Sequence, residues 1–313
     1  MKEPLHLQEI LTRPGVTDHG RVTALCRALC ARYPTLRPVT IGRSVLGRQI
    51  EALVLTPPDG VTGDRQRVLL AAAFHAQEWL TALCALRLCE DVCRAASAQL
   101  SLCGVRPDAA LREREVWFVP MVDPDGVQIA IDGSRAADGF AAAAAALGAD
   151  TPGLWQANVR GVDINHNFNA GWAQMQEAAE KNGWDRPGAR RYPGPQPESE
   201  PETRALTDLC RRYAFRHVVA LHSQGEEIYW QYGAHTPPQS EIMARVLGAA
   251  GGYAVAAPEG FAAYGGFKDW FIRCFGRPGF TIELGRGVNP LPVEGFEELY
   301  AKAQEMLLLS LLL

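Results

Sequence analysis

The 313-residue sequence contains no Cys-X-X-Cys pair, no His-Glu-X-X-His motif and no apolar run long enough to cross a membrane. The first absence excludes zinc knuckles and thioredoxin-like pairs, and the second excludes the zinc peptidases that carry both histidines on one helix. The longest apolar run, residues 306–313, is far shorter than the roughly 20 residues of a membrane-spanning helix. The opening residues lack the apolar core of a secretory signal, so we expect a cytoplasmic protein with no membrane partner.

Positive charge is not in excess, because 31 Lys and Arg stand against 35 Asp and Glu, for a net charge of −4. Nucleic-acid-binding proteins need surplus positive charge to neutralise phosphates, so no nucleic-acid partner is expected. The composition, 47% hydrophobic and 21% charged, is that of a globular domain and excludes a disordered chain. The eight cysteines indicate small buried side chains in a reducing compartment. Nothing in the sequence indicates an obligate protein partner.

Strand-like apolar runs alternate with amphipathic helical patterns along the chain. This predicts one α/β domain over residues 1–313, with a central mixed, mostly parallel twisted sheet and helices on both faces. The expected strands are 39–41 and 50–55, which form a hairpin, and 68–74, 115–121, 217–221 and 280–284. The expected helices are 17–34, 79–95, 200–213, 238–250 and a C-terminal helix from about Glu294.

Three segments are expected to lie outside this alternation. Residues 1–16 form an N-terminal lead-in, residues 132–153 form a loop excursion with a short surface helix, and residues 170–198 form a long polar excursion. Long ordered excursions are often functional. After the last of them, Ser199 and Glu202 are expected to form a capping box that opens the next helix.

Chemistry-bearing residues stand at the ends of three expected strands. His75 and Glu78 follow the strand 68–74, His222 follows 217–221, and Glu283 lies within 280–284. Ligands of open α/β sheets bind beyond the carboxyl ends of the strands. Two histidines and a glutamate form one of the sets that bind catalytic zinc and leave a fourth position open for water. A His-X-X-Glu pair alone is a weak signal, so the joint placement at strand ends is what favours a zinc site.

A series of segments, in the same order, resembles the zinc carboxypeptidases of the M14 type. They are TIGRSVLGRQIEALVL (40–55), FHAQEWLTA (74–82), DPDGV (123–127), RGVDINHNF (160–168), YPGPQPESEPET (192–203), LHSQG (221–225), GGFKDW (265–270) and GFTIELG (279–285). The segments WQANVRGVDIN, HSQGEEIYW, GGFKDWF and RPGFTIELG are most similar to one bacterial branch. That branch, related to endopeptidase I and murein peptide amidase, cleaves γ-D-glutamyl-meso-diaminopimelate bonds in cell-wall peptides.

The resemblance implies the same fold and a role for each matching residue. His75, Glu78 and His222 would bind one Zn²⁺ per chain, and Glu283 would act as general base and proton shuttle. Asp163 would orient His75 through the second ring nitrogen. Two alternatives remain open from the residues themselves. Glu283 could instead pair with an arginine, and Asp163 could cap a turn.

Several positions depart from the pancreatic pattern of the family. That pattern has an Asn-Arg pair that grips the terminal carboxylate of the substrate, whereas this chain has Asn165-His166, and histidine lacks the bidentate fork of arginine. The transition-state arginine of the family is replaced by Gln156. Gln156 or the nearby Arg160 could stabilise the oxyanion, and Arg160 could equally form a surface ion pair.

Two further departures lie in the segment 261–270. Phe261 occupies the position of the family's mobile tyrosine, so Tyr264 could replace it or could merely pack. Lys268 stands at the floor of the side-chain pocket, where it would favour an acidic or zwitterionic group such as the end of diaminopimelate. A solvated lysine on a helix face is the alternative.

The resemblance therefore implies a zinc metallopeptidase that hydrolyses the γ-D-glutamyl-meso-diaminopimelate bond of small murein peptides, through zinc-activated water and a Glu base. An M14-type carboxypeptidase or amidase of other specificity is one alternative. A pseudopeptidase that binds zinc and peptide without turnover is another, which the departures at Gln156 and Phe261 motivate. Peptide length, oligomeric state and a role in recycling or in sporulation stay open.

Overall fold

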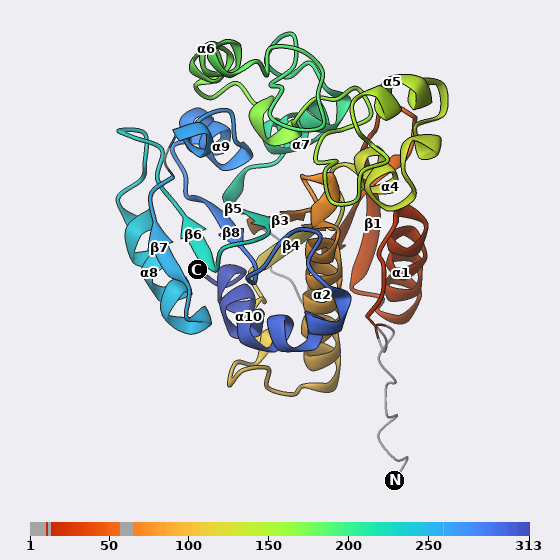
Figure 1. The fold of residues 1–313 in the computed structure, drawn as a ribbon. Helices are drawn as coiled ribbons and strands as arrows, with labels where there is room; N and C mark the ends of the chain where they lie inside the picture. The colour runs from red at the N-terminus through yellow and green to blue at the C-terminus, as the bar shows by residue number, and fades with distance from the viewer. Residues whose placement is uncertain (1–10, 12–13, 57–64, 259) are drawn as a thin grey trace.

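A computed structural model describes residues 11, 14–56, 65–258 and 260–313, and its described strands form one sheet in the order β1-β2-β4-β3-β5-β8-β6-β7 (Figure 1). The strands are β1 (Leu36–Arg43), β2 (Gln49–Leu55), β3 (Gln66–Ala72), β4 (Arg114–Val119), β5 (Phe215–His222), β6 (Glu227–Tyr229), β7 (Ala254–Ala256) and β8 (Gly279–Glu283). The central strands β4, β3, β5 and β8 run parallel, and β2 and β6 pair antiparallel at either side of them. The predicted mixed sheet with a parallel centre is confirmed.

Helices cover both faces of this sheet (Figure 1). They are α1 (His19–Arg32), α2 (Leu80–Ala98), α3 (Pro107–Ala110), α4 (Pro124–Asp132), α5 (Ala141–Ala146), α6 (Trp172–Asn182), α7 (Pro201–Arg212), α8 (Gln239–Gly251), α9 (Phe267–Phe275) and α10 (Phe296–Ser310). One apolar core joins the sheet to α1, α2, α8 and α10, and a second joins the opposite face to α7 and α9. Because β3 and β5 are buried between both cores, their sequences are continuous apolar runs rather than alternating ones.

The structure contains elements that the sequence patterns did not predict, namely α3, α4, α6, α9, β6 and β7. The excursion 170–198 begins with α6, and the excursion 132–153 contains the 3-10 helix η2 (Ser134–Phe140) and α5. Most of the predicted lead-in 1–16 lies outside the described residues. Of the cysteines, all are free thiols, and Cys103 and Cys274 are exposed rather than buried.

The predicted capping box at the start of α7 is wrong. Glu200 is the N-cap residue, and no side chain caps the helix. Glu202 is fully buried and accepts hydrogen bonds from the backbone of Val45 and from the side chain of Asn158. These tertiary partners replace the local bond to Ser199, whose hydroxyl donates to Glu200 instead.

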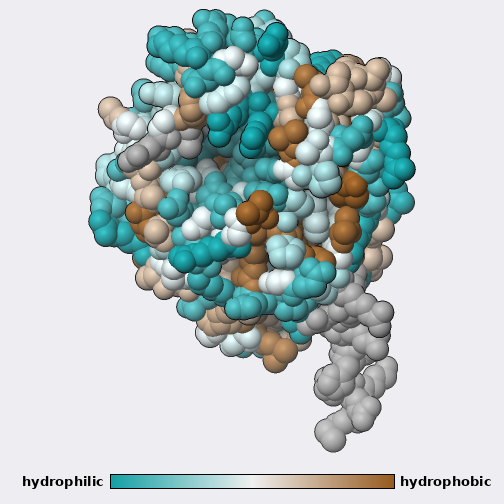
Figure 2. Space-filling model, viewed as in Figure 1, coloured by the Kyte–Doolittle hydropathy of each residue, from teal (hydrophilic) through white to brown (hydrophobic). Residues whose placement is uncertain are grey.

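Within the described part of the chain, no helix is both long and apolar enough to cross a membrane. On the face that Figure 1 shows, hydrophilic residues predominate and apolar residues form small separate groups (Figure 2).

Candidate metal centre and substrate pocket

The turn after β3 brings His75 and Glu78 to one side of the chain. β3 ends at Ala72, and His75 is the N-cap residue of the 3-10 helix η1 (Ala76–Glu78). Side chains three residues apart eclipse one another in a 3-10 helix. This local geometry explains why the spacing His-X-X-Glu places both donors together, with His75 Nδ1 2.9 Å from Glu78 Oε1.

The neighbouring parallel strands deliver the other two predicted residues to the same edge of the sheet. His222 is the last residue of β5, which pairs with β3, and Glu283 is the last residue of β8. His222 and Glu283 are direct partners in the β5–β8 register. The predicted strand ends therefore do meet, at the carboxyl edge of the parallel sheet.

His75, Glu78 and His222 form a compact cluster whose ligand atoms all lie within 4.8 Å of one another. Nδ1 of His222 is 3.2 Å from Nδ1 of His75 and 3.0 Å from Oε2 of Glu78. The His222 ring stacks on Phe74, with centroids 5.0 Å apart. Two imidazole nitrogens that face each other beside a carboxylate are a donor set suited to zinc.

Contacts behind the cluster fix its orientation. Asp163 Oδ1 lies 3.2 Å from Nε2 of His75, as the resemblance implied, and its Oδ2 accepts from Gln156 Nε2 and from the Arg191 backbone. Asn289 reaches the cluster from a distant loop: its Nδ2 is 3.5 Å from Glu78 Oε1 and 2.6 Å from the Ser223 carbonyl. A histidine ligand held by a buried carboxylate keeps one tautomer and one ring orientation.

The electrostatics of the site follow from burial and from the carboxylates. Burial opposes protonation of His75, but Glu78 and Asp163 outweigh it and raise its pKa well above the usual range. Burial lowers the pKa of His222, with Glu78 opposing. Burial and the charge of Glu78 raise the pKa of Glu283 well above that of an ordinary glutamate. A cation at the cluster would offset the mutual repulsion of these carboxylates.

A pocket of about 350 Å³ opens beside the cluster. It is lined by His75, Asn165, His166, Arg191, Tyr229, Phe261, Gly266, Lys268, Asp269, Thr281 and Glu283. The structure thus brings Asn165, His166, Lys268 and Glu283 together, as the resemblance implied. Asn165 Oδ1 accepts from the Phe267 backbone at the start of α9, and His166 Nδ1 donates to the Tyr264 carbonyl.

Of the residues predicted to act in catalysis or substrate binding, three do not line this pocket. Arg160 forms an ion pair with Glu200 at 3.5 Å, the alternative that the sequence left open, although Glu200 is buried and only Arg160 is exposed. Tyr264 lies against Gly171 and lines a different hollow, next to Tyr232 and His235. Gln156 is engaged with Asp163 rather than aimed into the pocket. Chain connectivity gives no measure of loop direction, so the sequence could not decide where Arg160 and Tyr264 lie relative to the pocket.

The pocket also contains residues that the sequence reasoning missed. Arg191 enters it from the excursion 170–198, and Tyr229 enters it from β6, with its hydroxyl donating to Glu227. Asp269 is fully buried beside Lys268, and the two side chains form an ion pair. A basic residue in a long ordered excursion was the available signal for Arg191.

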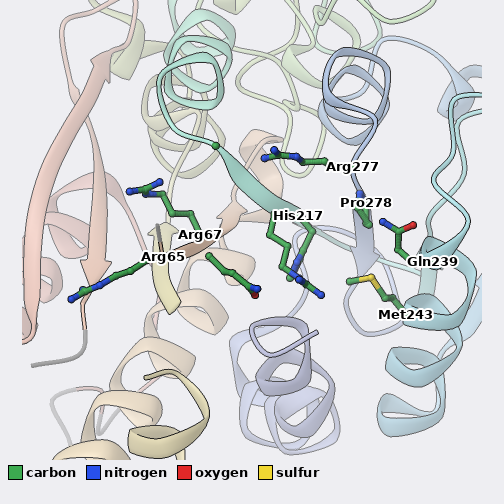
Figure 3. A pocket seen from close by; sticks show the side chains of 10 residues that line it. Arg65, Arg67, His217, Gln239, Met243, Arg277 and Pro278 are labelled. Carbon is green, nitrogen blue, oxygen red and sulfur yellow. The ribbon is translucent and has the colours of Figure 1, made fainter. Parts of the chain in front are cut away.

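Another cavity lies at the opposite, amino edge of the parallel strands (Figure 3). Its volume is about 470 Å³, and its lining includes Arg65, Arg67, His217 and Arg277. His217 is buried, and its Nε2 donates to the Ser310 carbonyl at 2.6 Å, whereas its Nδ1 has no hydrogen-bond partner among the described residues. The predicted satisfied histidine therefore holds for one ring nitrogen only. This cavity does not adjoin the metal cluster.

The fold and the site define an α/β protein with a metal centre and an adjoining pocket at the carboxyl edge of its sheet. A family model described as "Zinc carboxypeptidase" matches residues 22–306. The chain is 34% identical over 298 residues to "Gamma-D-glutamyl-L-diamino acid endopeptidase 1" of Lysinibacillus sphaericus, covering 95% of this chain and 72% of that protein. The chain therefore belongs to the zinc carboxypeptidase family and is a zinc metallopeptidase.

Solved structures agree on the fold. The crystal structure of thrombin-activatable fibrinolysis inhibitor aligns with a TM-score of 0.72 at 19% identity, covering 94% of this chain and 73% of that one. The murein-tripeptide amidase of Escherichia coli O157 aligns with a TM-score of 0.52 at 24% identity, covering 86% of this chain and 91% of that one.

Proposed function

We propose that the protein hydrolyses the γ-D-glutamyl-meso-diaminopimelate bond of small murein peptides. The observation that carries this proposal is one pocket that joins the metal-binding cluster and Glu283 to a buried Lys268–Asp269 ion pair. The similarity to the Lysinibacillus endopeptidase, which covers nearly the whole chain, supports the same substrate class.

His75, Glu78 and His222 would hold the zinc ion, and Asp163 would keep His75 in the tautomer whose Nδ1 is free to bind it. The cluster fits zinc because its donors converge within 4.8 Å. When bound, zinc polarises a carbonyl and lowers the pKa of water to about 7.

Glu283 would take the proton from the attacking water and pass it to the leaving nitrogen. It lines the pocket beside His75, which is the position that a general base requires. Gln156 is assigned a positioning role, because its amide donates to Asp163 at 3.1 Å. Arg160 and Tyr264 do not line the pocket.

The Lys268–Asp269 pair would recognise the distal end of diaminopimelate, which carries one ammonium and one carboxylate. Lys268 Nζ donates to Asp269 and to the Gln231 carbonyl at 2.7 Å. An ammonium has three donors, so one remains for a substrate carboxylate. A neutral pair of opposite charges complements a zwitterion better than a single cation does.

Removing one metal ligand tests the site. We expect His75→Ala to be folded but to hold far less zinc than the wild type, because two of three donors remain and the site loses its Asp163-supported ligand. The measurement is zinc content after dialysis, by atomic emission. His217→Ala is the matched control, because His217 is a buried histidine outside the cluster and should leave zinc content unchanged. Full occupancy and activity in His75→Ala would refute the assignment.

The substrate is tested by comparing L-Ala-γ-D-Glu-meso-diaminopimelate with the same peptide carrying lysine. Lysine lacks the distal carboxylate, so one charged hydrogen bond is lost, and we expect kcat/KM to fall about 10- to 150-fold. A like-charge penalty from Lys268 is not added, since Asp269 neutralises it. Equal efficiencies would refute this pocket assignment. Chelator-insensitive binding without cleavage would instead favour a non-catalytic peptide-binding protein.

A further inference from the structure

The positive charge available to a substrate in this pocket is smaller than its lining suggests. Lys268 is neutralised by Asp269, and His166 uses Nδ1 to reach the Tyr264 carbonyl. Arg191 is different, because within the described residues no carboxylate forms an ion pair with it. Its guanidinium is therefore a charge without an ion-pair partner among the described residues, on a residue that lines the pocket.

Aromatic side chains hold this guanidinium in place. It lies 4.4 Å from the centroid of the Trp184 ring and 5.8 Å from that of Phe261. The two rings pack edge to face, with centroids 4.5 Å apart. A guanidinium held against aromatic rings in this way still has N–H groups that can donate to a carboxylate. Because the side chain is already ordered, binding a substrate immobilises less of it.

The backbone of Arg191 is tied to the metal centre. Its N–H donates to Asp163 Oδ2 at 3.0 Å, and Oδ1 of the same carboxylate holds His75. Arg191 adopts φ 69°, a left-handed conformation that a long side chain rarely takes. Such a conformation persists where surrounding contacts determine it, and it is enriched at ligand-binding sites. Asp163 thus fixes Arg191 and His75 relative to each other.

From these contacts we infer that Arg191 binds the α-carboxylate of the diamino acid that the reaction releases. This inference rests on the proposed function. The α-carboxylate is the charged group nearest the leaving nitrogen. Asp163 holds the backbone of Arg191 at the metal end of the pocket, whereas Lys268 lies at the start of α9. Arg191 thereby supplies, from a different segment of the chain, the fork that His166 lacks.

The test pairs a variant with a change in the substrate. Arg191→Gln is compared with the wild type on the γ-D-glutamyl-meso-diaminopimelate peptide and on the same peptide with its α-carboxylate converted to an amide. For the free acid, kcat/KM should fall about 10- to 150-fold in the variant, mainly through KM. For the amide, the two proteins should be nearly equal. Arg191→Lys should retain part of the preference for the acid. Arg190→Gln, an exposed neighbour, is the matched control and should behave as the wild type.

Equal losses on acid and amide in Arg191→Gln, or no loss on either, would overturn the inference and indicate a structural role. Calorimetric binding of free meso-diaminopimelate to the zinc-loaded protein separates this result from the proposed function. Suppose that the wild type does not cleave the peptide but binds meso-diaminopimelate at least tenfold more tightly than Arg191→Gln does. The proposed scissile bond is then wrong, and the role of Arg191 in binding the carboxylate is retained. If the wild type cleaves the peptide and the variant treats acid and amide alike, the function stands and the Arg191 assignment falls.

Discussion

Glu283→Gln should keep its zinc and its fold but lose turnover by about 10²–10⁴-fold, the range for a positioned acid–base group. The amide matches the carboxylate in shape but cannot accept a proton from water. Glu283 stands at the end of β8, opposite His222 in the strand register, and lines the pocket together with His75. The loss should therefore appear in kcat and in kcat/KM alike, because the interaction is made in the transition state.

The matched control for this variant is Glu227→Gln. Glu227 faces Glu283 across the β6–β8 pair, but its carboxylate accepts from Tyr229 and it does not line the pocket. The same chemical change there should reduce turnover far less. Steady-state kinetics of zinc-loaded protein, with zinc content measured on the same samples, decide the matter. Turnover of Glu283→Gln near that of the wild type would mean that the base is elsewhere.

The metal centre was predictable from the sequence because it depends on regular structure. Buried parallel strands are continuous apolar runs, and the residues that follow them meet at one edge of the sheet. His75, His222 and Glu283 are each the end of such a run or lie within four residues of it. Residue type and strand position were therefore enough to bring them together.

The substrate pocket was predictable only in part, because its remaining residues come from irregular segments. Arg191 lies in the stretch after α6 and itself adopts the left-handed conformation. No hydrophobic periodicity in the sequence predicts such a turn. The count along the chain to Asp269 leads to Phe261, which does line the pocket, whereas the loop directs its suggested replacement Tyr264 toward Gly171. Counting residues gives the contour length of a loop but not its direction.

Contacts between distant segments also could not be predicted from the sequence. Asn289 reaches Glu78 across 211 positions of the chain.

Lys268 and Asp269 are adjacent on a helix, where neighbouring side chains normally point apart. Their ion pair forms at the first turn of α9 because both are excluded from water, which sequence alone does not reveal.

Burial of this pair gives the second large expected effect, a loss of about 3–5 kcal/mol in the free energy of unfolding for Lys268→Met. The side chains of Lys268 and Asp269 are 3% and 1% exposed, so removal of the cation leaves a carboxylate buried without its partner. Exchanging both residues, as in Lys268→Met with Asp269→Leu, should restore most of the stability, since no charge is then left buried. Lys181→Met is the control. It breaks a pair with Glu177 whose side chains are 69% and 66% exposed, and solvent screening leaves such pairs little effect on the free energy of unfolding.

The deficit of Lys268→Met should also depend on pH in a defined direction. Burial already raises the pKa of Asp269 despite Lys268, and removal of the lysine raises it further. A carboxyl group whose pKa is higher in the folded than in the unfolded protein destabilises the fold increasingly as pH rises above the unfolded value of about 4. The difference from wild type should therefore be largest near pH 8 and should shrink toward pH 4. Urea unfolding of the metal-free proteins measures it, and a variant as stable as Lys181→Met at pH 8 would show that Asp269 gains its stability from other partners.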